Sequence, residues 1–99
     1  MSIDHNHPQG VMVRIPTQLR TLTGGAGEVV VEGPTVVEVL KALDASHPGI
    51  AERIFDDSGK IRRSVNVFVS DEDIRFLEGA DTPVSPGQTV SIIPAVAGG

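Results

Sequence analysis

The sequence predicts a single small α+β domain in which a mixed sheet of four or five strands packs against one main helix. Three observations support this prediction. Short runs of β-branched residues recur along the chain, one segment has the apolar periodicity of a helix, and glycine or proline separates the segments. Their order is strand, strand, helix, strand, short strand, strand. A chain of 99 residues fits one such domain and leaves little room for a second.

Two strands with a long connection open the predicted domain. Residues 11–15 (VMVRI) are rich in β-branched side chains and stop at Pro16, and residues 28–32 (EVVVE) form a similar run. Between them, residues 17–27 contain several glycines and are expected to be a loop. The two strands are therefore predicted to form a hairpin with a long turn.

The main helix is predicted to begin after Gly33-Pro34 and to end near Ser46. Thr35 and Glu38 have the spacing of a capping box, in which the hydroxyl accepts a hydrogen bond from a free backbone N–H and the carboxylate reaches back. Such a cap contributes about 1 kcal/mol. The segment then places four apolar residues on one stripe, which the sheet can cover: Val36, Val39, Leu40 and Leu43.

The second half of the chain supplies a further helical turn and the remaining strands. Residues 50–55 are expected to be helical, residues 65–69 (VNVFV) form a strand, and residues 90–93 (VSII) form the last strand. Residues 71–73 are expected to turn the chain, and residues 74–76 (IRF) to form a short edge strand. Two hairpin-like halves joined by a crossover helix give the β-grasp arrangement of ubiquitin-like proteins.

Alternation along the strands assigns their side chains to two faces. The face toward the helix carries the predicted core: Val11, Val13, Ile15, Val29, Val31, Val65, Val67, Val69, Val90 and Ile92. The opposite face carries one apolar residue on each main strand, and these form a candidate partner-docking surface: Met12, Val30, Phe68 and Ile93. The alternative is that this face is covered by residues 17–27 or by the N-terminal segment.

The composition argues against several classes of function. The net charge is −5 and the pI is near 4.9, which disfavours nucleic-acid binding. The absence of cysteine excludes disulfides, thiolate metal sites and cysteine nucleophiles. No apolar run approaches the roughly 18 residues of a membrane span, and residues 1–10, a polar lead-in, lack the pattern of a secretory signal. We therefore expect a cytoplasmic protein that is monomeric when free and binds no membrane.

Other polar clusters give weaker candidates. His5 and His7 lie in the lead-in without further ligands nearby, so no metal site is predicted. Residues 71–73 (DED) lack a full calcium loop and are interpreted as a solvated turn or an acidic contact for a basic partner. Residues 23–25 (TGG) lack the helix and lysine of a phosphate loop. We expect no catalytic residue and no bound cofactor.

The C-terminal segment is the strongest functional candidate. Residues 95–99 follow Pro94 and can reach roughly 20 Å from it when extended. Gly98 and Gly99 have no side chains, so the tail is narrow enough to enter a partner's active site and to present the Gly99 carboxylate there. A frayed chain end is the simpler explanation of two glycines taken alone. The tail expected to enter the partner consists of Ala95, Val96, Ala97, Gly98 and Gly99.

Three segments of the chain resemble a known family. Residues 85–99 (SPGQTVSIIPAVAGG) are similar to the ends of the MoaD/ThiS family of ubiquitin-like sulfur carriers, in which a last strand runs through a proline into Gly-Gly. Residues 65–76 (VNVFVSDEDIRF) and 15–25 (IPTQLRTLTGG) resemble its CysO branch, the carriers of a cysteine biosynthesis pathway. Molybdopterin-type carriers often have aromatic residues where this chain has Ile92-Ile93, which favours the cysteine-type branch. The resemblance covers about residues 11–99.

The resemblance implies a cycle that partner enzymes carry out. An E1-like adenylating or sulfurtransferase enzyme would activate Gly99 with ATP, and a sulfur donor would convert it to a C-terminal thiocarboxylate. A sulfur-consuming biosynthetic enzyme would then use the sulfur, in a cysteine-type pathway or in a thiosugar, thiamin or molybdopterin pathway. Two other functions stay open. One is a ubiquitin-like modifier joined to target lysines through Gly99, with Lys41 and Lys60 as the chain's own lysines. The other is a plain protein-binding module that uses the outer sheet face.

Overall fold

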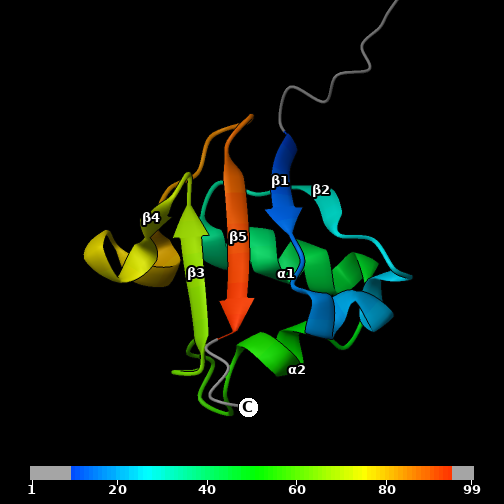
Figure 1. Cartoon of the computed structure of the whole chain (residues 1–99). Helices are drawn as coiled ribbons and strands as arrows, with labels where there is room; N and C mark the ends of the chain where they lie inside the picture. The colour runs from blue at the N-terminus through cyan, green and yellow to red at the C-terminus, as the bar shows by residue number, and fades with distance from the viewer. Residues whose placement is uncertain (1–9, 95–99) are drawn as a thin grey trace, which may run out of the picture.

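The computed structural model describes residues 10–94, through which a five-stranded mixed sheet runs in the order β2-β1-β5-β3-β4 (Figure 1). The strands are β1 (Gly10–Arg14), β2 (Glu28–Glu32), β3 (Val65–Val69), β4 (Glu72–Asp73) and β5 (Thr89–Pro94). The helices are α1 (Val36–Ser46) and α2 (Ile50–Ile54), with short 3₁₀ helices η1 (Thr17–Thr23), η2 (Ile74–Phe76) and η3 (Gly79–Asp81). This is the predicted β-grasp arrangement.

The last strand, β5, lies at the centre of the sheet. It pairs with β1 in parallel and with β3 in antiparallel orientation, whereas β1–β2 and β3–β4 are antiparallel hairpin pairs. The predicted hairpin of the first two strands is therefore confirmed, and its first strand begins at Gly10, one residue earlier than expected. The parallel contact between β1 and β5 joins the two halves of the chain into one sheet.

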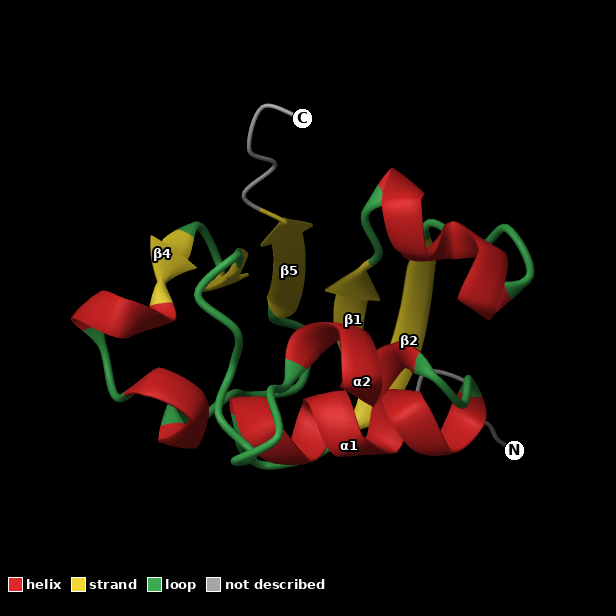
Figure 2. Cartoon of the chain, turned by 90° about the horizontal axis from the view of Figure 1, so that it is seen from below, coloured by secondary structure: helices red, strands yellow, loops and turns green. Residues whose placement is uncertain are grey.

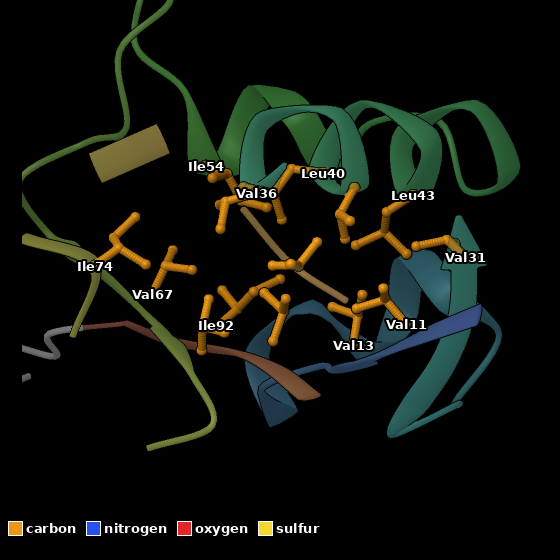
Figure 3. Close-up of a cluster of buried hydrophobic side chains, with 14 of the residues drawn as sticks. Val11, Val13, Val31, Val36, Leu40, Leu43, Ile54, Val67, Ile74 and Ile92 are labelled. Carbon is orange, nitrogen blue, oxygen red and sulfur yellow. The ribbon is translucent and has the colours of Figure 1, made fainter. Parts of the chain in front are cut away.

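Helix α1 packs across one face of this sheet and supplies the helical side of the core (Figure 2). The Thr35 hydroxyl accepts a hydrogen bond from the Glu38 backbone N–H at 3.4 Å, so Thr35 caps the helix as predicted. The other half of the predicted capping box is wrong, because the Glu38 carboxylate forms no hydrogen bond with the Thr35 backbone N–H in the described structure. The whole predicted stripe has no exposed surface, and Figure 3 shows three of its members pointing toward the strands: Val36, Leu40 and Leu43. The helix ends at Ser46, as the sequence indicates.

The predicted assignment of sheet faces is confirmed with one exception. Val29 is only half-buried and packs at the margin of the core, although Val31 on the same edge strand β2 is buried. The other nine members of the predicted core are buried: Val11, Val13, Ile15, Val31, Val65, Val67, Val69, Val90 and Ile92. Further buried residues come from outside the strands and α1: Ile50, Ile54, Ile74 and Val84.

The prediction that residues 17–27 form a loop is wrong for its first part. Residues 17–23 form η1, and Leu19 and Leu22 pack against the core cluster. Their spacing of three residues places both side chains on the same side of a 3₁₀ turn. The helix ends at Gly24, which adopts a left-handed conformation with φ of 68°. Only the remainder of the segment, up to β2, is a turn.

The predicted edge strand at residues 74–76 is also wrong, because the chain turns earlier than expected. The turn lies at Ser70 and Asp71, which both have positive φ (51° and 76°), rather than at residues 71–73. The edge strand is therefore β4, which lies opposite the last two residues of β3. Residues 74–76 form η2, where Ile74 is buried and Phe76 is exposed.

Candidate functional site

The predicted sulfur-accepting residue, Gly99, lies outside the described residues together with the rest of the tail, residues 95–98. The role of the tail therefore stays a prediction. The structure does define the residue from which the tail leaves the sheet. This residue is Pro94, the last residue of β5, and it lies opposite Val65 at the beginning of β3.

The base of the tail is held in place by the centre of the sheet. Strand β5 has strand partners on both sides (Figure 1). Its inward side chains, Val90 and Ile92, are 0% and 3% exposed. Because two strand pairs and the core hold β5, the chain beyond Pro94 starts from a fixed point at one end of the sheet.

All four residues of the predicted docking surface lie on the face away from α1. Met12 lies directly opposite Val30 in the β1–β2 pair. Phe68 lies opposite Ser91 on β5, and Ile93 is two residues further along that strand, so Phe68 and Ile93 are diagonal neighbours. Val30 and Ile93 are 53% and 47% exposed, whereas Met12 and Phe68 are half-buried.

A polar row divides these four residues into two apolar pairs, Met12–Val30 and Phe68–Ile93. Arg14 lies opposite Ser91 in the β1–β5 pair, between the two apolar pairs. The Arg14 Nε atom is 3.7 Å from a Glu28 carboxylate oxygen, and both side chains are more than half exposed. The outer face therefore presents two small apolar contacts around a charged centre rather than one continuous apolar patch.

A shallow hollow of about 260 Å³ lies beside the end of β5. Ile93 and Pro94 form part of its lining, and the end of β1 forms the opposite wall with Arg14 and Pro16. The hollow connects the outer face with the base of the tail. A partner that fills it therefore contacts the docking surface and the residue that precedes the tail at the same time.

The segment considered as an alternative cover for the outer face packs elsewhere. Residues 17–23 are directed toward the core through Leu19 and Leu22. Thr23 is 5% exposed, and its hydroxyl lies 2.7 Å from the Ala26 carbonyl oxygen, to which it donates a hydrogen bond. Thr23 thus closes the turn that follows η1. The other alternative cover, the N-terminal segment, lies outside the described residues.

A hydrogen-bonded group of three polar side chains borders the outer face at β4. The Arg75 guanidinium donates to Asp73 Oδ2 at 3.0 Å and also to Asn66 Oδ1. The hydrogen bond from Arg75 lowers the pKa of the Asp73 carboxyl group, and Asp73 in turn raises the pKa of Arg75. Asp73 lies opposite Phe68, so this ion pair fixes a charged group beside the apolar pair Phe68–Ile93.

Within the described residues, two kinds of site can be excluded, a metal centre and a membrane-spanning helix. Between residues 10 and 94, no group of histidine, aspartate and glutamate side chains is large enough to hold a metal ion. The histidines at positions 5 and 7 lie outside this range. No helix in the same range combines the length and the apolar character that a membrane span requires.

Sequence reasoning missed a second surface, which lies on the flank of the sheet at β4. It is a groove between residues 59–63 and the segment that contains η2 and η3. On the same flank, Phe76 is 85% exposed. Four basic residues line the groove: Lys60, Arg62, Arg63 and Arg75. No local signal in the sequence brings residues 59–63 next to residues 73–80, because that contact is made by the tertiary fold.

The sheet order, the helix across one face and the central last strand together define a ubiquitin-like β-grasp protein. The chain belongs to the ThiS family, whose model matches residues 13–99. The sulfur carrier protein CysO of Mycobacterium tuberculosis is 48% identical over 91 residues, which span 90% of this chain and 98% of that protein. These matches confirm the predicted class, a CysO-like sulfur carrier rather than an enzyme.

Two further relatives bear on the partners and on the alternative function. A crystal structure of the BexX/CysO complex of Amycolatopsis orientalis contains a chain with a TM-score of 0.85 and 46% identity, and the match covers 90% of this chain and 99% of that one. Small archaeal modifier protein 3 of Haloferax volcanii is 38% identical over 65 residues, which cover 66% of this chain and 70% of that protein. The second relative is named as a modifier, so it keeps the modifier hypothesis open.

Proposed function

We propose that this chain carries sulfur as a thiocarboxylate on Gly99. On an E1-like partner enzyme, a Gly99 carboxylate oxygen attacks the α-phosphorus of ATP, which forms an acyl-adenylate and releases pyrophosphate. Sulfide then attacks the acyl carbon and displaces AMP, so one carboxylate oxygen is replaced by sulfur. The partner binds ATP and supplies the catalytic groups, and this chain supplies the carboxylate.

The central position of β5 is the observation that carries this proposal. Two neighbouring strands hold β5, and Pro94 stands five residues before Gly99. An extended tail of that length reaches roughly 20 Å, so it can enter an active site while the folded domain stays outside. The match to the ThiS family model also continues to residue 99.

The outer sheet face is the proposed docking surface for the adenylating enzyme and for the sulfur-consuming enzyme. Phe68 and Ile93 form the apolar pair nearest the base of the tail, and the hollow beside Pro94 continues from it. Met12 and Val30 add a second contact beyond Arg14. The CysO of Amycolatopsis orientalis forms a complex with the protein BexX, which supports a carrier that acts through partner proteins.

We further propose that the sulfur enters a cysteine-type pathway. The support is the 48% identity to CysO over nearly the whole length of both chains. A thiosugar, thiamin or molybdopterin pathway is the alternative. The two are distinguished by offering the thiocarboxylate form to purified enzymes of each pathway and measuring which of them returns the chain to its carboxylate form.

Intact-mass spectrometry tests the thiocarboxylate directly. The full chain is incubated with ATP, sulfide and an adenylating enzyme shown to be active on a CysO protein. We expect the mass increase that corresponds to replacement of one oxygen by sulfur, and no increase in a variant that lacks Gly99. Because Gly99 lies beyond the last strand, that variant should unfold at the same urea concentration as the parent chain. An unchanged mass of the full chain would refute the proposal.

A charge placed on the outer face tests the docking surface. Phe68→Glu should weaken binding to the adenylating enzyme by roughly 30-fold, which corresponds to about 2 kcal/mol for loss of a central apolar contact. Ala45→Glu is the matched control, since it adds the same charge at an exposed position of α1. Equal binding by the two variants would place the docking surface elsewhere.

The modifier function is a second candidate because of the similarity to small archaeal modifier protein 3. It shares the activation of Gly99 but ends in an amide bond to a lysine rather than in sulfur transfer. Proteolysis of target proteins should then leave a Gly-Gly remnant on lysine. The chain's own lysines, Lys41 and Lys60, are both exposed and are the sites at which self-conjugation would be detected.

A further inference from the structure

The short length of β4 leaves a groove on one flank of the sheet. Strand β4 lies opposite only Phe68 and Val69, after which the chain turns into η2. The first part of β3, residues 65–67, therefore has no strand beside it on this flank (Figure 1). The space is a groove of about 350 Å³, bounded by residues 59–63 on one side and by residues 73–80 on the other.

The groove has an apolar floor and a cationic rim. Its floor consists of Ile61, Val65, Val67, Ile74 and Ala80. Its rim carries Lys60, Arg62, Arg63 and Arg75, with Asp73 as the one acidic residue. The lining thus has an excess of three positive charges, although the chain has a net charge of −5. Four of the eight basic residues of the sequence gather at this one feature.

Two of these cations are available to a ligand. Within residues 10–94, the side chains of Lys60 and Arg63 form no hydrogen bond and no salt bridge, and both residues are exposed. Arg62 donates to the Glu52 carbonyl oxygen at 3.0 Å and 3.3 Å, a neutral acceptor that leaves its charge in place. The charge of Arg62 is partly offset by the nearby Asp56 carboxylate. The pKa of Asp56 is lowered by hydrogen bonds from the Ser58 hydroxyl and the Lys60 backbone N–H and, to a smaller extent, by the charge of Arg62.

The wall formed by η2 and η3 also presents apolar side chains to solvent. Phe76 and Leu77, which lie between the wall residues Arg75 and Gly79, are 85% and 40% exposed. Phe76 is the most exposed of the large apolar residues in the described part of the chain. The flank therefore offers apolar contacts together with positive charge. A small anion would use only the positive charge.

We infer that this groove binds an extended acidic segment of a partner protein that also carries an apolar side chain. The apolar side chain covers the floor of the groove, and glutamate or aspartate carboxylates pair with Lys60 and Arg63. The segment continues past Arg75 to Phe76, which lies outside the groove lining. Nucleic acid fits poorly because the chain as a whole is acidic. The groove lies beyond β3 from β5, so a segment bound there leaves Ile93 and Pro94 accessible. The inference does not depend on the chemistry of Gly99.

A defined peptide tests this inference on the full chain. The probe is a short, end-capped peptide rich in glutamate that contains leucine, and the control peptide has lysine in place of glutamate. In a ¹⁵N NMR titration at low salt, we expect the glutamate peptide to shift the backbone amides of Ile61, Arg63 and Gly79. The lysine peptide should leave them unchanged. Physiological salt should weaken the interaction, because exposed charges are screened.

Charge reversal separates the groove from the overall charge of the protein. Arg63→Glu should weaken peptide binding about tenfold. Lys41→Glu is the matched control, because it makes the same change at an exposed position of α1, outside the groove, and it should leave binding unchanged. Lys60→Glu repeats the test at a second groove residue, and Phe76→Ser should weaken binding without any change in charge.

Several results would overturn the inference. The first is an equal loss of peptide affinity in Arg63→Glu and Lys41→Glu. The second is a set of amide shifts concentrated on the outer face around Phe68, and the third is the absence of amide shifts at millimolar peptide. Concentration-dependent shifts of the groove amides without peptide would also overturn it, because they would identify a second copy of the chain as the occupant. NMR spectra of the free variants that match the parent outside the mutated site ensure that a loss of binding reports on the groove.

Discussion

Replacing Gly33 with alanine tests how closely α1 approaches the end of β2. A Cβ atom at this position would lie 2.8 Å from the Val39 backbone nitrogen and 3.0 Å from the Glu38 carbonyl carbon. Ordinary contacts of this kind are 3.4–4 Å long. Both atoms belong to the backbone of α1, so no side chain can rotate to make room. The helix itself has to move.

The size of the effect follows from the movement that α1 must make. Restoring ordinary contact with Val39 requires a shift of at least about 0.6 Å, the difference between the two distances. The helix cannot move freely, because its apolar stripe is completely buried against the sheet. Overpacking of this kind costs about 1–3 kcal/mol, and reduced flexibility of the unfolded chain recovers roughly 0.4–1 kcal/mol. Taking the middle of each range, we expect Gly33→Ala to lower the free energy of unfolding by about 1.3 kcal/mol, and the Tm by roughly 5–10 °C.

Urea unfolding followed by circular dichroism measures this difference, with Gly27→Ala as the control. A Cβ at Gly27 would lie 3.1 Å from the Arg20 guanidinium, the far end of a flexible side chain whose Nε donates to the Ile15 carbonyl oxygen at 3.1 Å. Moving this exposed side chain loses at most that one hydrogen bond, which water can replace, so the control should lower the free energy of unfolding by no more than about 0.5 kcal/mol. If Gly33→Ala unfolds at the same urea concentration as Gly27→Ala, α1 does not pack as closely as the structure indicates, and the reasoning is refuted.

Three further predictions concern local hydrogen bonds. Thr35→Ala should lower the free energy of unfolding by about 0.5–1 kcal/mol through loss of the cap of α1, whereas Thr35→Ser should preserve it, as measured in urea. Asp44→Ala should lower the free energy of unfolding by about 1–3 kcal/mol, because Asp44 Oδ1 accepts hydrogen bonds from two backbone N–H groups at the start of α2, at 3.1 and 2.9 Å. An unchanged urea midpoint would contradict this role of Asp44. The pKa of Asp73 is lower in the folded protein than in the unfolded chain. This difference stabilises the fold at pH values above the unfolded pKa, and the stabilisation is lost as pH falls through the folded pKa. Arg75→Gln should therefore reduce the loss of unfolding free energy between neutral and acidic pH, as measured by urea unfolding at a series of pH values. Identical pH profiles of the variant and the parent chain would exclude the ion pair as the cause.

The positions of the regular elements could be predicted because short-range geometry determines them. Alternation in residues 65–69 and 90–93 predicts which side chains face the core, since successive residues of a strand point to opposite faces. The capping pattern at Thr35 predicts the start of α1 for an equally local reason. The parallel pairing of β1 with β5 has no such signal, because the paired residues are distant in the sequence.

The wrong predictions concern segments whose local signals are weak. Two-residue hairpin turns with positive φ are usually marked by Asn-Gly or Asp-Gly, whereas here the turn is Ser70-Asp71. The sequence therefore indicates a turn one residue too late, and the short strand that follows is displaced with it. In η1, Leu19 and Leu22 are too few to show a helical period, although their spacing was the available signal.

The candidate site could be predicted only where it depends on strand geometry or on the tail. The face that carries Met12, Val30, Phe68 and Ile93 follows from alternation, and the structure places all four there. The polar row through Arg14 that divides them depends on strand register, which residue spacing does not determine. The flank groove depends on the return of residues 73–80 toward residues 59–63, which is a property of the whole fold.

The location of β5 also determines how the domain responds to mechanical load. A pull along β5 at Pro94 acts parallel to two strand interfaces, one with β1 and one with β3. Their hydrogen bonds are therefore loaded together in shear and cannot open one after another, as they would if the strand lay at an edge. A partner can hold or withdraw the segment beyond Pro94 without peeling β5 from the sheet, so the force is transmitted to the domain as a rigid body.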